Sequence, residues 1–131
     1  MPTTPTLDEL RSTGITFENA FAAPVCSPTR AAIMSGKYGN KTGVLTVPGH
    51  LELIHESIFK ALENQTSGLY SDAVIGKWHL AEGNNLDHPQ DHGVDYFSGV
   101  IGGGVQDYFS WNKVVNGVGS TSTQYITSEL T

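Results

Sequence analysis

The sequence contains one cysteine, Cys26, among its 131 residues. A single cysteine excludes an internal disulfide, and no set of Cys and His residues has the spacing of a zinc finger. Long apolar runs are also missing, so we expect no membrane span. With 38% hydrophobic residues and 15 glycines, the chain has the composition of one ordinary globular domain that can bury a core.

Positive charge is scarce. The chain has 7 Lys and Arg against 13 Asp and Glu, for a net charge of −6. No basic surface is therefore expected, and we predict no nucleic-acid partner. An acidic chain that acts on an anion must gather its few cations at one place. The first residues, MPTTPTLDELRSTG, have neither the basic nor the apolar region of a signal peptide, so the sequence leaves the localisation open.

Hydrophobic periodicity predicts alternating helices and strands. Helices are expected over residues 4–14, from Pro28 to Gly36 with Cys26 or Ser27 as the cap, over 56–65, and in the tail 120–131. Strands are expected over 15–22 and 69–80, short strands or turns over 93–109, and loops over 39–50 and 81–93. This order predicts an α/β fold with a mostly parallel sheet flanked by helices.

The cysteine lies where a helix is expected to begin, in the stretch VCSPTRAAIMSGKY. Free backbone N–H groups at a helix N-terminus favour negative charge, either a thiolate or a bound anion. Arg30 follows four residues later, so on a helix it returns to the same face as Cys26. The alternative interpretation is a buried, inert cysteine beside a surface arginine.

The second candidate cluster is IGKWHL, at the end of an expected strand. Alternation directs Lys77 and His79 to one face and Trp78 to the other. Ligands of open α/β sheets bind beyond the carboxyl ends of the strands, where a cation and an imidazole suit an anionic substrate. The alternative is a solvated lysine and a histidine bonded to backbone.

Weaker patterns remain. His88 and His92 have a spacing that could bind metal on a helix, but Pro89 favours a loop. IGGGV resembles a phosphate-binding loop only faintly. NKT and NQT are glycosylation sites only in a secreted protein of a cell that glycosylates. Acyl transfer by Cys26 and His79 is conceivable, but it leaves Arg30 and Lys77 without a role.

Together these stretches resemble the type I sulfatase family (arylsulfatase-like) of the alkaline-phosphatase-like superfamily. CSPTRAAIMSGKY matches the family's first signature, and GKWHL matches its second. TPTLDEL, GITFENAFA, KTGV and HGVDYF follow in the family's usual order, so the resemblance covers essentially the whole chain. It implies a partial alkaline-phosphatase-like fold and a hydrolase of sulfate monoesters.

The resemblance also implies a purpose for the cysteine. In this family a maturation enzyme oxidises the cysteine of Cys-x-Pro-x-Arg to formylglycine, which hydrates to a geminal diol. One hydroxyl at position 26 would attack sulfur and expel the alcohol. The second hydroxyl would then lose its proton, and collapse to the aldehyde would release sulfate. By the same resemblance Arg30 would hold the hydrated residue, Lys77 would bind sulfate oxygens, and His79 would hydrogen-bond the diol and position or deprotonate it.

Metal binding departs from the family pattern. Family members hold a divalent cation, usually calcium, with an Asp-Asp pair, a later Asp-Asn pair and the formylglycine. Of these ligands only Cys26, as formylglycine, has a counterpart in this chain. We therefore expect residues 1–131 to be a fragment of one catalytic domain, truncated at both ends and inactive in isolation.

Two other functions stay open at this point. The same signatures suit a phosphonate monoester or phosphodiester hydrolase, and a catalytically inactive remnant is the third possibility. The resemblance implies two partners, a sulfate ester and the formylglycine-generating enzyme. Relatives are commonly periplasmic, secreted or lysosomal.

Overall fold

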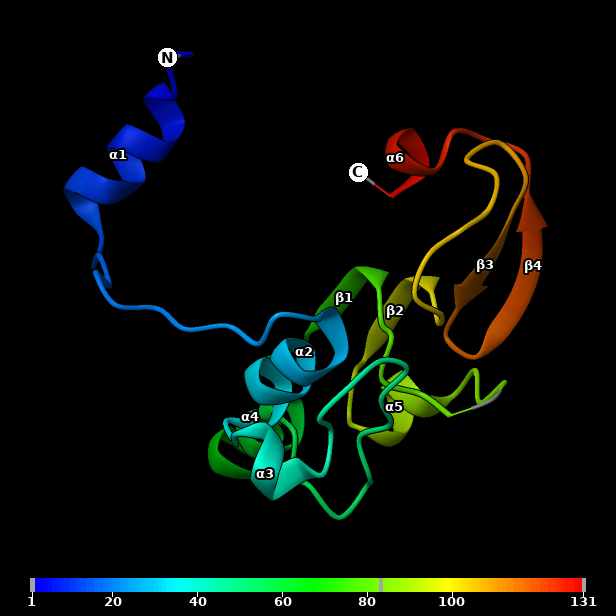
Figure 1. Cartoon of the computed structure of the whole chain (residues 1–131), viewed down its shortest axis with the longest axis horizontal. Helices are drawn as coiled ribbons and strands as arrows, with labels where there is room; N and C mark the ends of the chain where they lie inside the picture. Colours follow the sequence, from blue (N-terminus) through cyan, green and yellow to red (C-terminus); the bar gives the residue numbers. More distant parts are fainter. Residues whose placement is uncertain (1, 83, 131) are drawn as a thin grey trace.

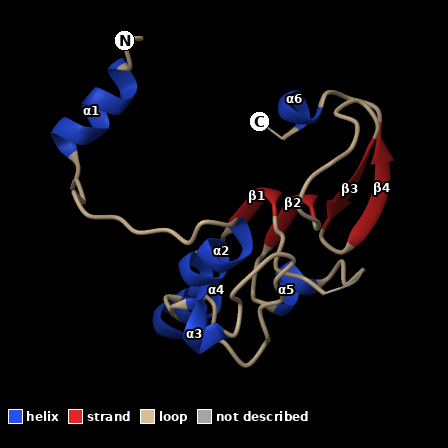
Figure 2. Cartoon of the chain, viewed as in Figure 1, coloured by secondary structure: helices blue, strands red, loops and turns tan. Residues whose placement is uncertain are grey.

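The structure is a computed structural model that describes residues 2–82 and 84–130. Along these residues, four helices precede the first strand, and the four strands, with one short helix between the first two, build one sheet with helices beside it (Figures 1 and 2). The predicted α/β class is therefore confirmed. Within the described ranges, no helix combines the length and the apolar character needed to cross a bilayer.

The first element is helix α1, Pro5–Thr13, which ends at Gly14 as the sequence predicts. Thr4 occupies the N-cap position, although its side chain makes no capping bond. The strand expected over 15–22 is wrong, because these residues form no strand and pair with no other segment. Alternation there is not accompanied by burial, since every residue of that stretch is exposed. Helix α1 stands apart from the rest of the chain (Figure 1).

The next helices follow the predictions with small shifts. Helix α2, Cys26–Ser35, begins two residues before Pro28, has Val25 at its N-cap and ends at Gly36 with a left-handed φ of 66°. Helix α4, Ile58–Thr66, is capped by Ser57, whose side chain accepts a bond from the Lys60 N–H. The expected loop over 39–50 contains a single-turn helix, α3, Gly39–Thr42, so that expectation is wrong for its first residues.

The sheet has the order β1-β2-β3-β4. Its strands are β1 (Ala73–Lys77), β2 (Tyr96–Val100), β3 (Trp111–Val115) and β4 (Val118–Ser122). Strands β1 and β2 pair in parallel, and the segment between them contains the short helix α5, His88–Asp91, inside the expected loop 81–93. The other two pairs are antiparallel, so the expectation of a mostly parallel sheet is wrong.

The physical reason is the length of the connections. Asn116 and Gly117, with φ of 44° and 78°, form a two-residue turn between β3 and β4, and such a turn joins only antiparallel strands. The tail prediction is wrong in its first residues for the same reason, because β4 continues to Ser122. Helix α6, Ile126–Glu129, is one turn long.

The core joins residues of α2, β2 and β3 to the segments that follow α3, β1 and β2. Trp78 and Phe97 are its largest members, with ring centroids 6.2 Å apart in an edge-on arrangement. The other buried members of this cluster are Ala31, Val44, Leu51, Leu80, Val94, Ile101 and Val114. Because Trp78 and Leu80 flank His79, the end of β1 is anchored in this core.

Candidate active site

Cys26 is the first residue of α2, and its position is fixed by bonds on both sides. The preceding chain is held by Thr29, whose hydroxyl accepts a bond from the Ala23 N–H at 3.0 Å. Ser27 is fully buried, and its hydroxyl donates to the carbonyl of His79 at 3.0 Å. The N-terminus of α2 is therefore attached directly to the end of β1. Sequence reasoning named Ser27 only as a possible helix cap and did not predict its bond to His79.

Lys77 ends β1, and His79 follows two residues later. Trp78 is 1% exposed and points into the core, while Lys77 and His79 are half-buried, as the predicted alternation requires. His79 has a φ of 59°, a left-handed conformation that is uncommon for residues other than glycine. Its N–H donates to the carbonyl of Ile101 at 2.9 Å, which ties it to the segment after β2.

The structure brings the predicted residues together. The Sγ atom of Cys26 lies 3.1 Å from Nδ1 of His79. The Arg30 guanidinium donates to the carbonyl of Lys77 at 2.6 Å, so it braces the strand end. Cys26 and Arg30 also line a common hollow of about 420 Å³. A nucleophile candidate, an imidazole and two cations thus share one small region.

The electrostatics of this region favour negative charge. Partial burial raises the pKa of the Cys26 thiol. This effect is outweighed by a hydrogen bond from Lys77, by the charge of Lys77 and by the backbone N–H groups of Cys26 and Ser27, so the pKa is lowered overall. Desolvation lowers the pKa of His79, and the charges of Lys77 and Arg30 lower it further. His79 is therefore held neutral, with a nitrogen available to accept a proton.

Metal binding has no support from the same residues. The side chains around Cys26 are a lysine, an arginine and a histidine, whereas a hard divalent cation takes six or more oxygen ligands. Among residues 2–82 and 84–130, no group of three or more His, Cys, Asp or Glu side chains could hold a metal ion. The donor set of this chain alone does not fit calcium.

The remaining candidates lie in two different places. His88 and His92 are fully buried beneath Leu51, away from Cys26, and both ring Nε2 atoms contact the Leu51 carbonyl. The glycine stretch, in contrast, reaches the site, because a Cβ at Gly103 would lie 2.7 Å from Nε2 of His79. The faint resemblance of IGGGV to a phosphate-binding loop was the only sequence signal for Gly103.

Comparison with known proteins identifies the family of the chain. A sulfatase family profile matches residues 1–129. Mouse arylsulfatase J is 33% identical over 117 residues, which cover 84% of this chain and 19% of the relative. Human steryl-sulfatase is 36% identical over 114 residues, covering 74% of this chain and 19% of the relative. The chain therefore spans about a fifth of the length of these relatives.

Solved structures extend the likeness to the fold. The crystal structure of Ps i-CgsB superposes with a TM-score of 0.75 at 28% identity, over 96% of this chain and 33% of that one. The structure of BT4656 in complex with its substrate D-glucosamine-2-N,6-O-disulfate superposes with a TM-score of 0.72 at 29% identity. The match covers 96% of this chain and 24% of that one. The four-stranded sheet and its helices thus correspond to part of an alkaline-phosphatase-like fold. On these sequence and structural matches, the chain belongs to the sulfatase family.

Proposed function

We propose that this chain supplies the nucleophile, and the residues that orient it, for the hydrolysis of sulfate monoesters. The observation that carries the proposal is the 3.1 Å contact between Cys26 Sγ and His79 Nδ1, with Lys77 and Arg30 beside it. A sulfate ester is anionic, and two of the seven Lys and Arg residues of an acidic chain are gathered at this point. The family membership favours a sulfate rather than an acyl substrate.

Formylglycine at position 26 is part of the proposal. Formylglycine supplies a geminal diol. One hydroxyl can attack sulfur and expel the alcohol, and the other, after losing its proton, can re-form the aldehyde and release sulfate without attack by water. The site fits such a group because Cys26 lies at the edge of a hollow with a proton acceptor in contact. We propose that a formylglycine-generating enzyme acts on the stretch CSPTR before the chain folds.

Each neighbouring residue has a distinct role in the proposal. His79 accepts or holds a proton at Nδ1, next to the reacting group of residue 26. Lys77 offsets negative charge there, which is consistent with its effect on the pKa of the Cys26 thiol. Arg30 adds positive charge and also fixes the Lys77 carbonyl, so it orients the strand end that carries Lys77 and His79.

The sulfatase family generally uses a divalent cation. The residues of this chain do not form a complete site for one, so Cys26 in its formylglycine form is the single ligand that we propose from this chain. No step above depends on the cation.

Mass spectrometry of one peptide tests the proposed modification. Trypsin releases residues 12–30, which contain Cys26 as their single modifiable thiol. After co-expression with a formylglycine-generating enzyme, we expect conversion of the thiol to the aldehyde. An intact thiol, beside a converted control sulfatase peptide, would remove the nucleophile from the proposal.

Kinetics of the full-length gene product test the reaction. Hydrolysis of an aryl sulfate should be abolished in Cys26→Ala. In Lys77→Ala, kcat/KM should fall on the order of a hundredfold, because a preorganised charge at the reacting group is lost. The matched control is Lys41→Ala, on the exposed surface of α3, which should leave kcat/KM unchanged. Equal losses in both lysine variants would contradict the assigned role.

A further inference from the structure

The backbone around His79 requires support from its neighbours. Its left-handed φ of 59° is disfavoured for a residue with a β-carbon, and such a conformation persists only where the surroundings determine it. Two supports lie on the site side, namely the Ser27 hydroxyl on the His79 carbonyl and the Ile101 carbonyl on the His79 N–H. A third support lies on the opposite, buried side and involves residues without contact to Cys26.

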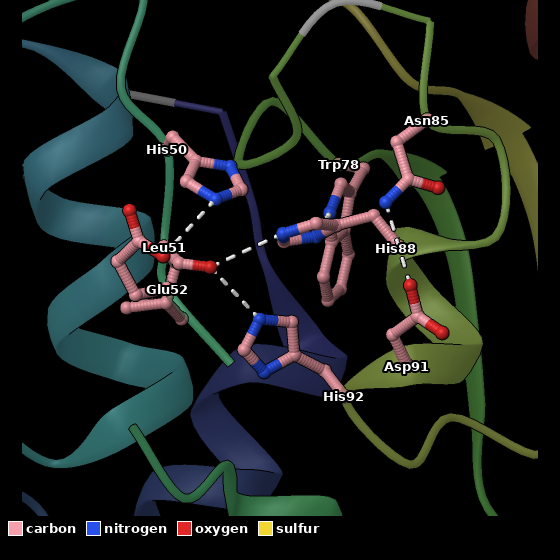
Figure 3. Close-up of polar contacts among 8 residues, drawn as sticks. All are labelled: His50, Leu51, Glu52, Trp78, Asn85, His88, Asp91 and His92. Atoms are coloured by element: carbon pink, nitrogen blue, oxygen red, sulfur yellow. Dashed lines mark hydrogen bonds and ion pairs between the residues drawn. The ribbon is translucent and has the colours of Figure 1, made fainter. Parts of the chain in front are cut away.

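This buried support is a chain of hydrogen bonds that starts one residue before His79 and returns one residue after it. The indole Nε1 of Trp78 donates to Nδ1 of His88 at 2.9 Å. Nε2 of His88 lies 3.1 Å from the Leu51 carbonyl, and the N–H of Leu51 donates to the Leu80 carbonyl at 3.0 Å. Figure 3 shows His88 between the Trp78 indole and the Leu51 carbonyl.

Only one protonation state of His88 satisfies both of its bonds. Indole Nε1 can only donate, so Nδ1 of His88 must accept and carries no proton. The ring proton therefore sits on Nε2 and donates to the Leu51 carbonyl. All partners are buried, so water does not compete for these bonds.

Two further histidines complete the cluster. Nε2 of His92 contacts the same Leu51 carbonyl at 3.0 Å, and the His92 ring lies 4.6 Å from the His88 ring between centroids. The His50 ring packs against the other side of His88, at 5.0 Å between centroids (Figure 3). These contacts leave His88 little freedom to rotate away from Trp78.

We propose that His88 is a positioning residue, which holds His79 against residue 26 by tying Trp78 to the Leu51 peptide. This inference rests on the proposed function, because the consequence of positioning is catalytic. The competing interpretation is that the hydrogen bonds only stabilise the core. The two differ in one respect, since positioning requires that the bond between residues 78 and 88 affect turnover at temperatures where every variant is folded.

The bond itself is tested in the 131-residue chain by the exchange of the two indole protons. The Trp78 indole is bonded to His88, and the Trp111 indole donates to the Gln124 carbonyl at 3.0 Å, so the second serves as an internal reference. In His88→Gln, exchange of the Trp78 indole proton should become markedly faster, while that of Trp111 stays the same. Unchanged exchange at Trp78 would overturn the proposal.

The positioning role is tested by kinetics of the matured full-length gene product. Trp78→Phe and His88→Gln remove the same bond from opposite ends. Each should lower kcat by about tenfold or more with little change in KM, because small displacements of a catalytic group are costly. The double variant should be no slower than the slower single variant, since both changes break one unit.

Two further variants separate positioning from general packing. His88→Asn keeps an oxygen acceptor near the position of Nδ1 and should recover part of the lost kcat. Trp111→Phe removes the indole bond of another buried tryptophan, from the start of β3 to the Gln124 carbonyl, and should leave kcat within about twofold, because that bond does not involve Trp78 or His88. Equal losses in Trp111→Phe, or losses that multiply in the double variant, would overturn the inference.

Failure of the inference and failure of the proposed function give different results. If the unaltered gene product does not hydrolyse aryl sulfate, the proposed function fails. If the gene product is active but Trp78→Phe and His88→Gln turn over as fast as it does, only the positioning role fails.

Discussion

Two parts of this chain use apolar side chains in opposite ways. In residues 2–25, which we call the N-terminal arm, every residue is exposed, including Phe21 at 93%. In residues 26–122, which we call the body, Phe97 is 0% exposed and Trp78 1%. Both parts contain aromatic and aliphatic residues in regular patterns, but only the body gives those residues partners.

The difference explains where the candidate site can form. Cys26 is the first residue of the body, and His79 lies between two buried residues. The last residues of the arm reach this region through the Thr29 hydroxyl, which bonds to Ala23 and to the Val25 carbonyl. A site that must hold atoms within fractions of an ångström depends on packed neighbours, and only the body provides them.

The largest effect is expected from Phe97→Ala. Removing this buried ring should lower the free energy of unfolding by about 3–5 kcal/mol, because the ring leaves a cavity beside Trp78. Urea unfolding of the 131-residue chain measures the change. A loss below about 1 kcal/mol would show that the body is not packed as described.

The body should also respond to pH through His88. Burial, reinforced by His92 and His50, lowers the pKa of His88 from 6.5 to about 4, although the Leu51 carbonyl and Asp91 oppose the shift. As the pH falls, His88 is protonated in the unfolded chain before it is protonated in the folded chain, because its pKa is higher in the unfolded chain. The contribution of neutral His88 to folding stability is therefore complete above pH 6.5 and is lost as the pH falls towards 4. The loss amounts to about 3 kcal/mol.

Unfolding experiments between pH 7 and pH 4 measure this loss, with His88→Gln as the control. The variant should be less stable at pH 7 but should lose less of its stability on acidification. An equally steep loss in the variant would assign the pH dependence to other groups, such as His92, whose pKa is also lowered by burial.

A smaller effect on stability, but a clear effect on activity, is expected from Gly103→Ala. The new Cβ would lie 2.7 Å from Nε2 of His79, so the ring would have to move. We expect kcat of the full-length gene product to fall by about tenfold. Gly102→Ala and Gly104→Ala place a Cβ in open space and should leave kcat unchanged. Equal losses in all three variants would mean that the loop, rather than the ring contact, matters.

Much of the site could be predicted from the sequence because its signals are local. The helix around Cys26 follows from hydrophobic periodicity and from Gly36, which ends it, and the strand that ends at Lys77 follows from its apolar residues. Alternation correctly places Trp78 and His79 on opposite sides. That Cys26 and His79 touch could not be derived from spacing, since 53 residues separate them. The resemblance to sulfatases supplied that expectation.

The errors have equally specific causes. Alternation over 15–22 predicts a strand, but a strand needs a partner, and pairing is not encoded in one segment. The β3–β4 hairpin was not predicted, although Asn116-Gly117 between two β-branched stretches is a strong local turn signal. The buried contacts of His88 could not be predicted, because they join Trp78, His88 and the Leu51 carbonyl, which lie in three separate segments of the sequence.

The smallest effect is expected from Phe21→Ala, which repeats the substitution of Phe97→Ala in the arm. Since Phe21 is 93% exposed, the free energy of unfolding should change by less than about 0.5 kcal/mol. Urea unfolding at several protein concentrations measures it. A loss comparable to that of Phe97→Ala would show that the arm is buried in solution. If that loss grew with protein concentration, the arm would be buried against a second copy of the chain. The contrast between arm and body would then disappear on association.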